Sequence, residues 1–141
     1  MFNFLSIVLS IIFISLAFLH FYWGISGKPV GDGMVPTNEK NEKLLNPKPL
    51  DCFVVAIGLL SFAWFVLIRS ELVIMHLPKW LLNSGLGVIT FIFLIRAIGD
   101  FKYIGLFKRI KHSKFAKLDT QYFSPLCLLI ALIAIAIELY K

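Results

Sequence analysis

The chain has 141 residues, of which 59% are hydrophobic and only 16% are charged, with a mean hydropathy of +0.86. Soluble domains contain roughly 45–50% apolar residues, so this composition excludes an ordinary soluble protein. A formal net charge of +6 in a soluble protein would suggest nucleic-acid binding. Here the charges lie between long apolar runs, so we predict a membrane protein without a nucleic-acid partner.

Four apolar runs have the length of membrane-spanning helices, which need about 20 residues each. A β-barrel would instead show many short alternating segments, and within lipid only a helix satisfies its own backbone hydrogen bonds. The sequence therefore predicts an all-α, four-transmembrane-helix bundle. It forms a single integral membrane domain over residues 1–141, with helices at about 2–23, 50–68, 80–98 and 123–140.

The first run is expected to be a retained helix and not a cleaved signal peptide. No Lys or Arg precedes Lys28, and the end of the run, Leu19-His20-Phe21-Tyr22-Trp23, lacks a small-residue cleavage site. A polar loop rich in Gly and Pro follows at 24–49 and cannot continue the helix.

Positive charge is distributed unevenly between the two sides of this topology. The loops at 24–49 and 99–122 share one side and carry ten Lys and Arg residues, whereas the other side carries three. Because cytoplasmic loops are enriched in Lys and Arg, we expect both loops in the cytoplasm and both termini outside. The ten are Lys28, Lys40, Lys43, Lys48, Lys102, Lys108, Arg109, Lys111, Lys114 and Lys117; the three are Arg69, Lys79 and Lys141.

Small and hydroxyl residues recur at helical spacing and predict which faces are packed against other helices. In the first helix this face ends at His20, which is therefore expected to point into the bundle near its cytoplasmic end. The predicted faces are Ser6, Ser10, Phe13, Ala17 and His20 in the first helix, Asn83, Gly87, Thr90 and Ala97 in the third, and Cys127, Ala131, Ala134 and Glu138 in the fourth.

Several polar residues are expected to gather at the cytoplasmic face. Arg96 and Asp100 are four residues apart and pair if the third helix continues through Gly99. A carboxylate beside His20 would orient its ring for acid–base chemistry, and we expect a hydrogen bond from His20, directly or through one water, to Arg96, Asp100, Asp119 or Tyr122. The alternative is that the polar residues at this face only cap helix ends. Asp51 and Ser124-Pro125 lie at helix starts, where they are suited to this role.

The loop at 99–122 combines periodic apolar residues with basic ones. Phe101, Ile104, Phe107 and Ile110 recur every three residues, as in a segment that lies among lipid headgroups. The alternative is that the basic charge only determines topology. For the first interpretation, the candidate contacts with anionic headgroups are Lys102, Lys108, Arg109, Lys111 and Lys114.

Cofactor and metal motifs are not found. Cys52 and Cys127 lack neighbouring ligands at metal spacing, so we predict no metal site and two free, reduced thiols. The sequence has no phosphate-binding loop, dinucleotide fingerprint or nucleophile elbow, and His20, His76 and His112 cannot form a bis-histidine haem site on this topology. We therefore expect no cofactor.

Three segments resemble a known family. They are Leu19-His20-Phe21-Tyr22-Trp23, the run RAIGDFKYIGLFKR at 96–109, and the run FAKLDTQYFSPLC at 115–127. The chain resembles a family of small four-helix bacterial membrane proteins catalogued as a domain of unknown function. The resemblance covers nearly the whole chain and implies a helical bundle in the bacterial inner membrane. It implies no activity.

Two functional hypotheses follow. The first is a non-catalytic protein that binds membrane lipid, or a partner, through its basic loop; the partner would be a second copy or another membrane protein. The second is a small membrane enzyme that acts on a lipid-soluble substrate, with His20, Arg96, Asp100 and Asp119 as the candidate catalytic residues. An enzyme requires these side chains to converge on one pocket, and the lipid-binding protein does not.

Overall fold

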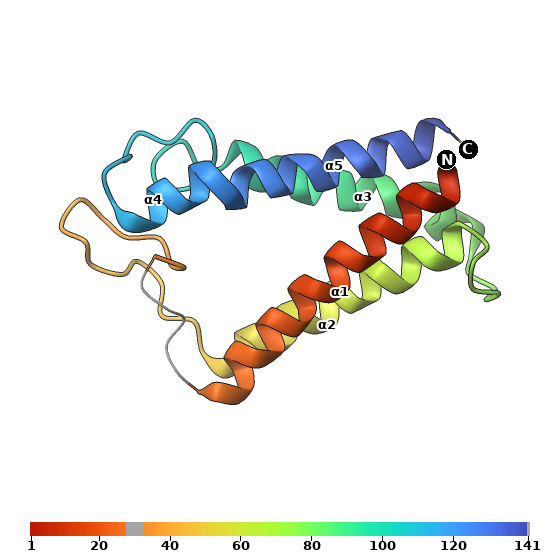
Figure 1. The fold of residues 1–141 in the computed structure, drawn as a ribbon, viewed down its shortest axis with the longest axis horizontal. Coiled ribbons are helices and arrows are strands. Elements are labelled where there is room, and N and C mark those ends of the chain that lie inside the picture. Colours follow the sequence, from red (N-terminus) through yellow and green to blue (C-terminus); the bar gives the residue numbers. More distant parts are fainter. Residues whose placement is uncertain (28–32, 141) are drawn as a thin grey trace.

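A computed structural model describes residues 1–27 and 33–140 (Figure 1). Lys28 and Lys141, which enter the charge count above, lie outside the described residues. The helices are α1 (Phe2–Ser26), α2 (Pro49–Arg69), α3 (Lys79–Ile98), α4 (Lys114–Leu118) and α5 (Ser124–Leu139), and a π-helical turn, η1 (Asp119–Phe123), joins α4 to α5.

Four helical segments are long and apolar enough to cross a membrane: α1, α2, α3 and the continuous segment Lys114–Leu139. All regular elements in the described residues are helices, so the predicted all-α bundle of four spans is confirmed. The outward faces carry large apolar side chains such as Phe4, Phe18 and Phe91, each more than half exposed, as expected where the surrounding solvent is lipid.

The fourth span begins nine residues earlier than the sequence indicated, at Lys114 and not at Phe123. Ser113 caps it, because the Ser113 hydroxyl accepts a hydrogen bond of 3.1 Å from the backbone N–H of Ala116. Pro125 has no N–H to donate within the helix. The chain accommodates it by widening one turn, in which the Ser124 N–H bonds the Asp119 carbonyl five residues back.

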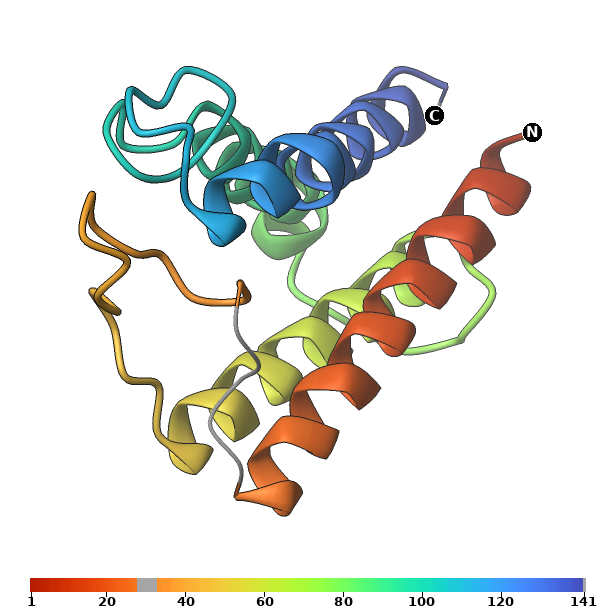
Figure 2. The same cartoon turned by 60° about the vertical axis from the view of Figure 1, so that its left-hand side comes forward.

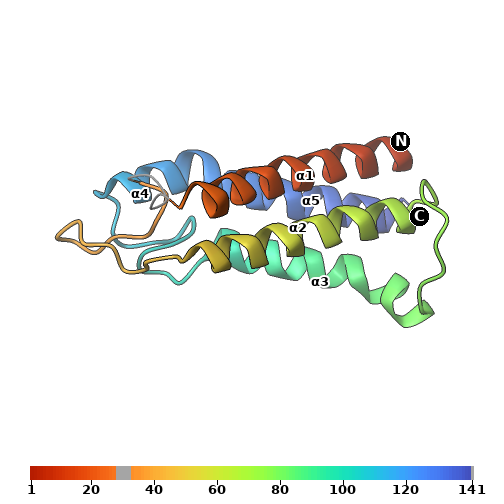
Figure 3. The same ribbon diagram turned by 90° about the horizontal axis from the view of Figure 1, so that it is seen from below.

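The four spans form two pairs, α1 with α2 and α3 with α5. The pairs meet where α1 begins and α5 ends, and they diverge toward the opposite end, where the loops at 33–48 and 99–113 lie (Figures 1 and 2). Seen from below, all four spans run along the long axis of the molecule (Figure 3). We refer to the end with these two loops as the loop end and to the other as the narrow end.

The packed face of α1 was predicted correctly. Ser6, Ser10, Phe13 and Ala17 are all buried, and the Ser10 hydroxyl donates to the Ala63 carbonyl of α2 at 3.3 Å. Small residues allow two helix backbones to approach closely in a membrane, which explains why this face lies against α2.

The packed face of α3 was predicted correctly at Ala97, which is buried, but wrongly at its other end. Asn83 and Gly87 are exposed, and the buried positions are Gly85, Leu86, Ile89, Phe93 and Ala97. Gly85 is the small residue that sets this rotation of the helix, because a Cβ at that position would overlap the ring of Phe65 from α2. In α5, Ala131 and Ala134 are buried as expected.

An ion pair joins the two helical pairs at the narrow end. The buried Arg69 of α2 donates from Nη2 to Oε2 of Glu138 in α5 at 3.0 Å. Glu138 was expected on the packed face of the fourth helix, and although it is exposed overall, its carboxylate contacts Arg69. A buried guanidinium needs such a partner, so this contact holds the narrow end together.

Candidate functional site

Asp119 lies at the centre of a buried cluster of charges at the loop end. Its carboxylate is fully buried and accepts a hydrogen bond of 3.1 Å from Nη2 of Arg96 on one oxygen. The other oxygen accepts from the Gly105 backbone N–H at 2.7 Å and from Nζ of Lys108 at 3.1 Å. We call Arg96, Lys108 and Asp119 the Asp119 cluster. It contains two cations and one anion.

Lys108 was predicted to contact lipid headgroups, which requires an exposed side chain, but it is buried. Its side chain is 1% exposed, and its ammonium group donates to Asp119, to the Gly105 carbonyl at 2.8 Å and to the Thr120 hydroxyl at 2.7 Å. An ammonium group has three N–H donors, and all three are used here. Lys108 therefore holds the loop onto the start of the fourth span and has no donor left for a lipid phosphate.

The predicted Arg96–Asp100 pair does not form, because α3 ends at Ile98 and Gly99 takes a positive φ of 79°. One Asp100 oxygen instead accepts three backbone N–H groups, those of Lys102, Tyr103 and Ile104, at 2.7–2.9 Å. Partial burial raises the pKa of Asp100, but these three hydrogen bonds outweigh it and hold the pKa below its usual value. Asp100 thus shapes the turn that follows α3.

His20 is half-buried at the loop end of α1. Its Nδ1 lies 2.7 Å from the Leu16 carbonyl one turn back, and its ring packs edge-on against Trp23 at a centroid distance of 5.1 Å. No direct hydrogen bond to Arg96, Asp100, Asp119 or Tyr122 forms in the described part of the chain, so the direct contact expected from the sequence is missing.

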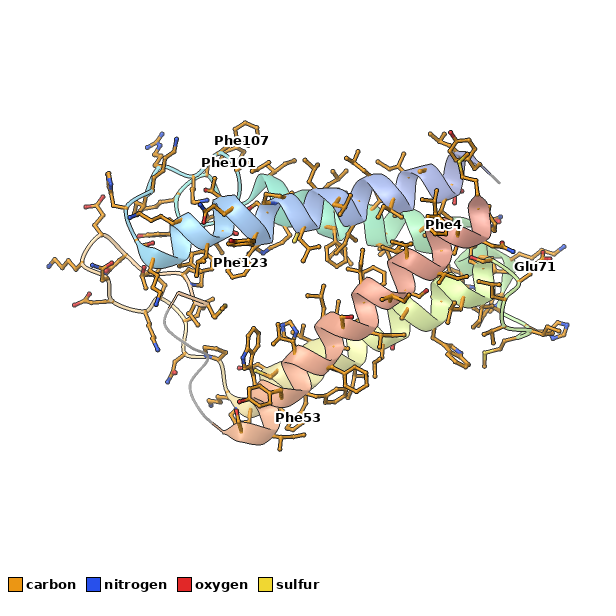
Figure 4. All side chains as sticks on the ribbon, in the orientation of Figure 1. Phe4, Phe53, Glu71, Phe101, Phe107 and Phe123 are labelled. Atoms are coloured by element: carbon orange, nitrogen blue, oxygen red, sulfur yellow. The ribbon has the colours of Figure 1, made fainter. Side chains whose placement is uncertain are left out.

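His20 and Arg96 nevertheless line the same space. A cavity of about 440 Å³ lies between the two helical pairs where they diverge, toward the loop end. Leu16, Trp23, Gly58 and Phe62 from α1 and α2 form one wall, and Phe93, Phe123, Cys127 and Ile130 are among the residues of the other. Phe123, the last residue of the wide turn η1, reaches toward this space (Figure 4). We call it the interhelical cavity; its lining is almost entirely apolar.

The outer surface of the loop after α3 is both aromatic and basic. Phe101 and Phe107 are 58% and 64% exposed, their ring centroids are 6.4 Å apart, and both project away from the helices (Figure 4). Four cationic side chains of the segment 102–114 are also exposed and form no ion pair with any other described residue. These four are Lys102, Arg109, Lys111 and Lys114.

The four residues proposed as catalytic thus divide into two sets. Arg96 and Asp119 bind each other, and His20 shares only the interhelical cavity with Arg96. Asp100 belongs to the loop turn. In the described residues no group of His, Cys, Asp and Glu is arranged to hold a metal, and Cys52 and Cys127 are free thiols.

The role of Lys108 was missed because nothing in its sequence context separates it from its neighbour Arg109. Its partner Asp119 is eleven residues away, which is not a helical spacing. The start of α4 was also missed, although Ser113, three residues before Ala116, was an available N-cap signal.

Searches among curated proteins and solved structures return no match to this chain. The match that is found is to a family model described as "Protein of unknown function (DUF3995)". It extends over residues 13–134 and so includes α2, α3, most of the first and fourth spans, the Asp119 cluster and the loop after α3. This chain is therefore a member of the DUF3995 family of unknown function.

Proposed function

We propose that this protein is a non-catalytic integral membrane protein that binds anionic phospholipid headgroups through the loop after α3. The observation that carries the proposal is the exposed surface of Phe101, Phe107, Lys102, Arg109 and Lys111, to which Lys114 adds a further charge. Aromatic side chains favour the boundary between headgroups and acyl chains, and each cation near an anionic bilayer surface contributes roughly 1 kcal/mol.

The loop is held in the conformation that exposes this surface. The Gly105 N–H and Lys108 bond Asp119, and three N–H groups bond Asp100. A surface that is already ordered loses less conformational entropy on binding. The buried cluster and the turn at Asp100 therefore support headgroup binding without contacting the lipid themselves.

The first prediction tests the headgroup contact with a variant that carries Gln at Lys102, Arg109, Lys111 and Lys114. Purified wild-type protein is expected to retain phosphatidylglycerol in preference to phosphatidylcholine in native mass spectrometry. In the variant, the ratio of retained phosphatidylglycerol to phosphatidylcholine is expected to fall at least tenfold, since four cations contribute about 4 kcal/mol at most.

The matched control exchanges Lys for Arg and Arg for Lys at the same four positions, which preserves the charge. This control is expected to retain the preference for phosphatidylglycerol. A wild-type protein that retains both lipids equally, or a Gln variant that behaves like wild type, would contradict headgroup binding by this loop.

A second candidate function is a membrane enzyme acting on a lipid-soluble substrate. One observation favours it: His20 and Arg96 both line the interhelical cavity. Because Nδ1 of His20 is engaged with the Leu16 carbonyl, Nε2 is the nitrogen that would exchange a proton with a substrate. In this candidate Asp119 and Asp100 act only as positioning residues. Turnover of a bound lipid, seen as a changed mass after incubation, would favour the enzyme over the first proposal.

The proposed location is a bacterial cytoplasmic membrane with the loop end in the cytoplasm and both termini outside. Two observations support this orientation. The loops at 33–48 and 99–113 lie at the same end of the molecule (Figure 1). The side with these loops carries ten Lys and Arg residues, and the other side carries three. On this orientation the basic loop surface faces the leaflet that is rich in anionic lipid.

The second prediction concerns topology. Alkaline phosphatase fused after Lys141 is expected to be active, and green fluorescent protein at the same position is expected to be dark, because the C-terminus would be exported. Inserted at His112, the two reporters should give the opposite result. Active phosphatase at His112 would place the basic loops outside and contradict the orientation.

A further inference from the structure

We infer that the interhelical cavity is a binding site for a single-chain lipid with a carboxylate head, such as a long-chain fatty acid. This site is separate from the headgroup-binding surface proposed above, which lies on the outside of the loop after α3. Its walls come from both helical pairs and also include Met34 of the first loop and Phe115 of α4.

The apolar part of the ligand is indicated by the shape and lining of the cavity. At about 440 Å³, it falls in the range of roughly 300–1,000 Å³ found for small-molecule sites. It is near the lower end of that range, which suits one acyl chain better than a two-chain phospholipid. The lining side chains are mainly Leu, Ile, Phe and Val, so the long part of the ligand must be hydrocarbon.

The charge of the head is indicated by the Asp119 cluster. Arg96 and Lys108 together carry two positive charges against the single negative charge of Asp119, which leaves one positive charge in excess. Lys108 is buried away from the cavity with all of its donors used, whereas Arg96 lines the cavity. An anionic head with one charge would therefore complete the electrostatic balance at Arg96.

Arg96 and His20 also have unused hydrogen-bonding atoms. Nη2 of Arg96 bonds Asp119, but its Nη1 is buried and has no hydrogen-bond partner among the described residues. A buried donor without a partner is costly, and a carboxylate is the group that a guanidinium binds best. With its Nδ1 engaged by Leu16, His20 leaves Nε2 as the ring nitrogen without a partner among the described residues. A carboxyl head can bond both atoms, and the excess positive charge at Arg96 favours it over a neutral alcohol.

Gly58 provides a way to block the cavity without touching the Asp119 cluster. It lines the cavity, and a Cβ added there would meet no atom within 4 Å. A large side chain at this position would extend into the open space. Gly87 of α3 provides the matched control, because it also has open space around an added Cβ but does not line the cavity.

The third prediction is a binding experiment with tritiated palmitate on the purified full-length protein in detergent. Wild type is expected to bind palmitate saturably at one molecule per chain. Gly58→Trp is expected to weaken binding at least tenfold, and Gly87→Trp to bind like wild type. Hexadecanol, which has the same chain and a neutral head, should compete at least tenfold less well than palmitate.

Each alternative result has a definite meaning. Absence of saturable binding to wild type, equal competition by hexadecanol, or unchanged binding to Gly58→Trp would overturn the inference. Should Gly58→Trp lower the melting temperature, the smaller Gly58→Leu replaces it and is held to the same criterion. Because none of these variants alters the loop after α3, phosphatidylglycerol retention can be measured on the same samples, and the two proposals fail separately.

Discussion

Replacement of Asp119 by Ala is expected to lower the free energy of unfolding by about 3–5 kcal/mol, the cost of removing one partner from a buried ion pair. The carboxylate is fully buried and is the charged partner of both Arg96 and Lys108. Without it, the Lys108 ammonium group remains 1% exposed with only the Gly105 carbonyl and the Thr120 hydroxyl as acceptors. Thermal unfolding in detergent, followed by tryptophan fluorescence, measures this loss.

The control for this fourth prediction is the double variant Asp119→Ala with Lys108→Met. It removes the buried cation together with its partner and leaves Arg96, which is 34% exposed and able to reach other acceptors. At least half of the lost stability should return, because replacement of a whole buried pair by apolar groups is often nearly neutral. If Asp119→Ala alone melts like wild type, the cluster does not hold the loop end together.

This expectation also separates the structural role of Asp119 from a catalytic one. Loss of a carboxylate that acts only in catalysis would lower turnover without lowering the free energy of unfolding. Asp119 has three of its roughly four acceptor positions occupied by donors of the protein itself, from Arg96, Gly105 and Lys108. The Asp119 carboxylate therefore stabilises the fold. The polar atoms near the cavity that form no hydrogen bond belong to Arg96 and His20.

The membrane spans were predictable from sequence because lipid imposes a simple rule of length and apolarity. The first three helices begin and end within three residues of the predicted ranges. The fourth was misjudged because Pro125 follows Ser124, as in a helix start, whereas the structure places this pair inside a longer helix after the wide turn η1. A π-helical turn has no simple sequence signal, so the extension back to Lys114 could be inferred only from the Ser113 cap.

The candidate site was predictable only in part. The topology correctly brought Arg96, Asp100 and Asp119 to one end of the molecule, but their partners depend on how each helix is rotated and where α3 ends. Gly99 decides between the two possible partners of Arg96. By ending the helix, it separates Arg96 from Asp100 and leaves Arg96 to bind Asp119. Backbone conformation at one glycine is beyond what charge spacing can predict.

The run at 96–109, which carries the family resemblance, is explained mainly by the architecture of the loop. Asp100 orders the turn, Lys108 fastens the loop to the fourth span, and Gly99 and Gly105 allow two backbone segments to approach closely. A motif of this kind specifies a shape. The residues that the loop turns outward, above all Phe101 and Phe107, are those that the proposed headgroup binding uses.

The fifth prediction is that Gly99→Ala lowers the free energy of unfolding by about 3 kcal/mol. Gly99 has a φ of 79°, and a Cβ there would overlap the Ile104 carbonyl oxygen. With its ψ of −163°, Gly99 is in a region that is essentially restricted to glycine and costs another residue about 1–3 kcal/mol, and overpacking typically adds about 1–3 kcal/mol. The neighbouring backbone cannot yield easily, because the Leu106 N–H bonds the Ala97 carbonyl at 2.9 Å across the same contact.

Two other glycines separate these causes. Gly27 also has a positive φ, but it is in the left-handed helical region with φ 57° and ψ 2° and has open space around an added Cβ. Gly27→Ala should therefore cost only the left-handed penalty of about 1–2 kcal/mol. Gly87 lies within α3 with open space around an added Cβ. Gly87→Ala should therefore raise the free energy of unfolding by up to about 1 kcal/mol. Melting temperatures in detergent test this order.

Gly99→Ala should also lose phosphatidylglycerol preference although every cation remains, because the loop no longer presents Phe101 and Phe107 together. Equal stability of Gly99→Ala and Gly27→Ala would show that the close backbone approach is not what orders the loop.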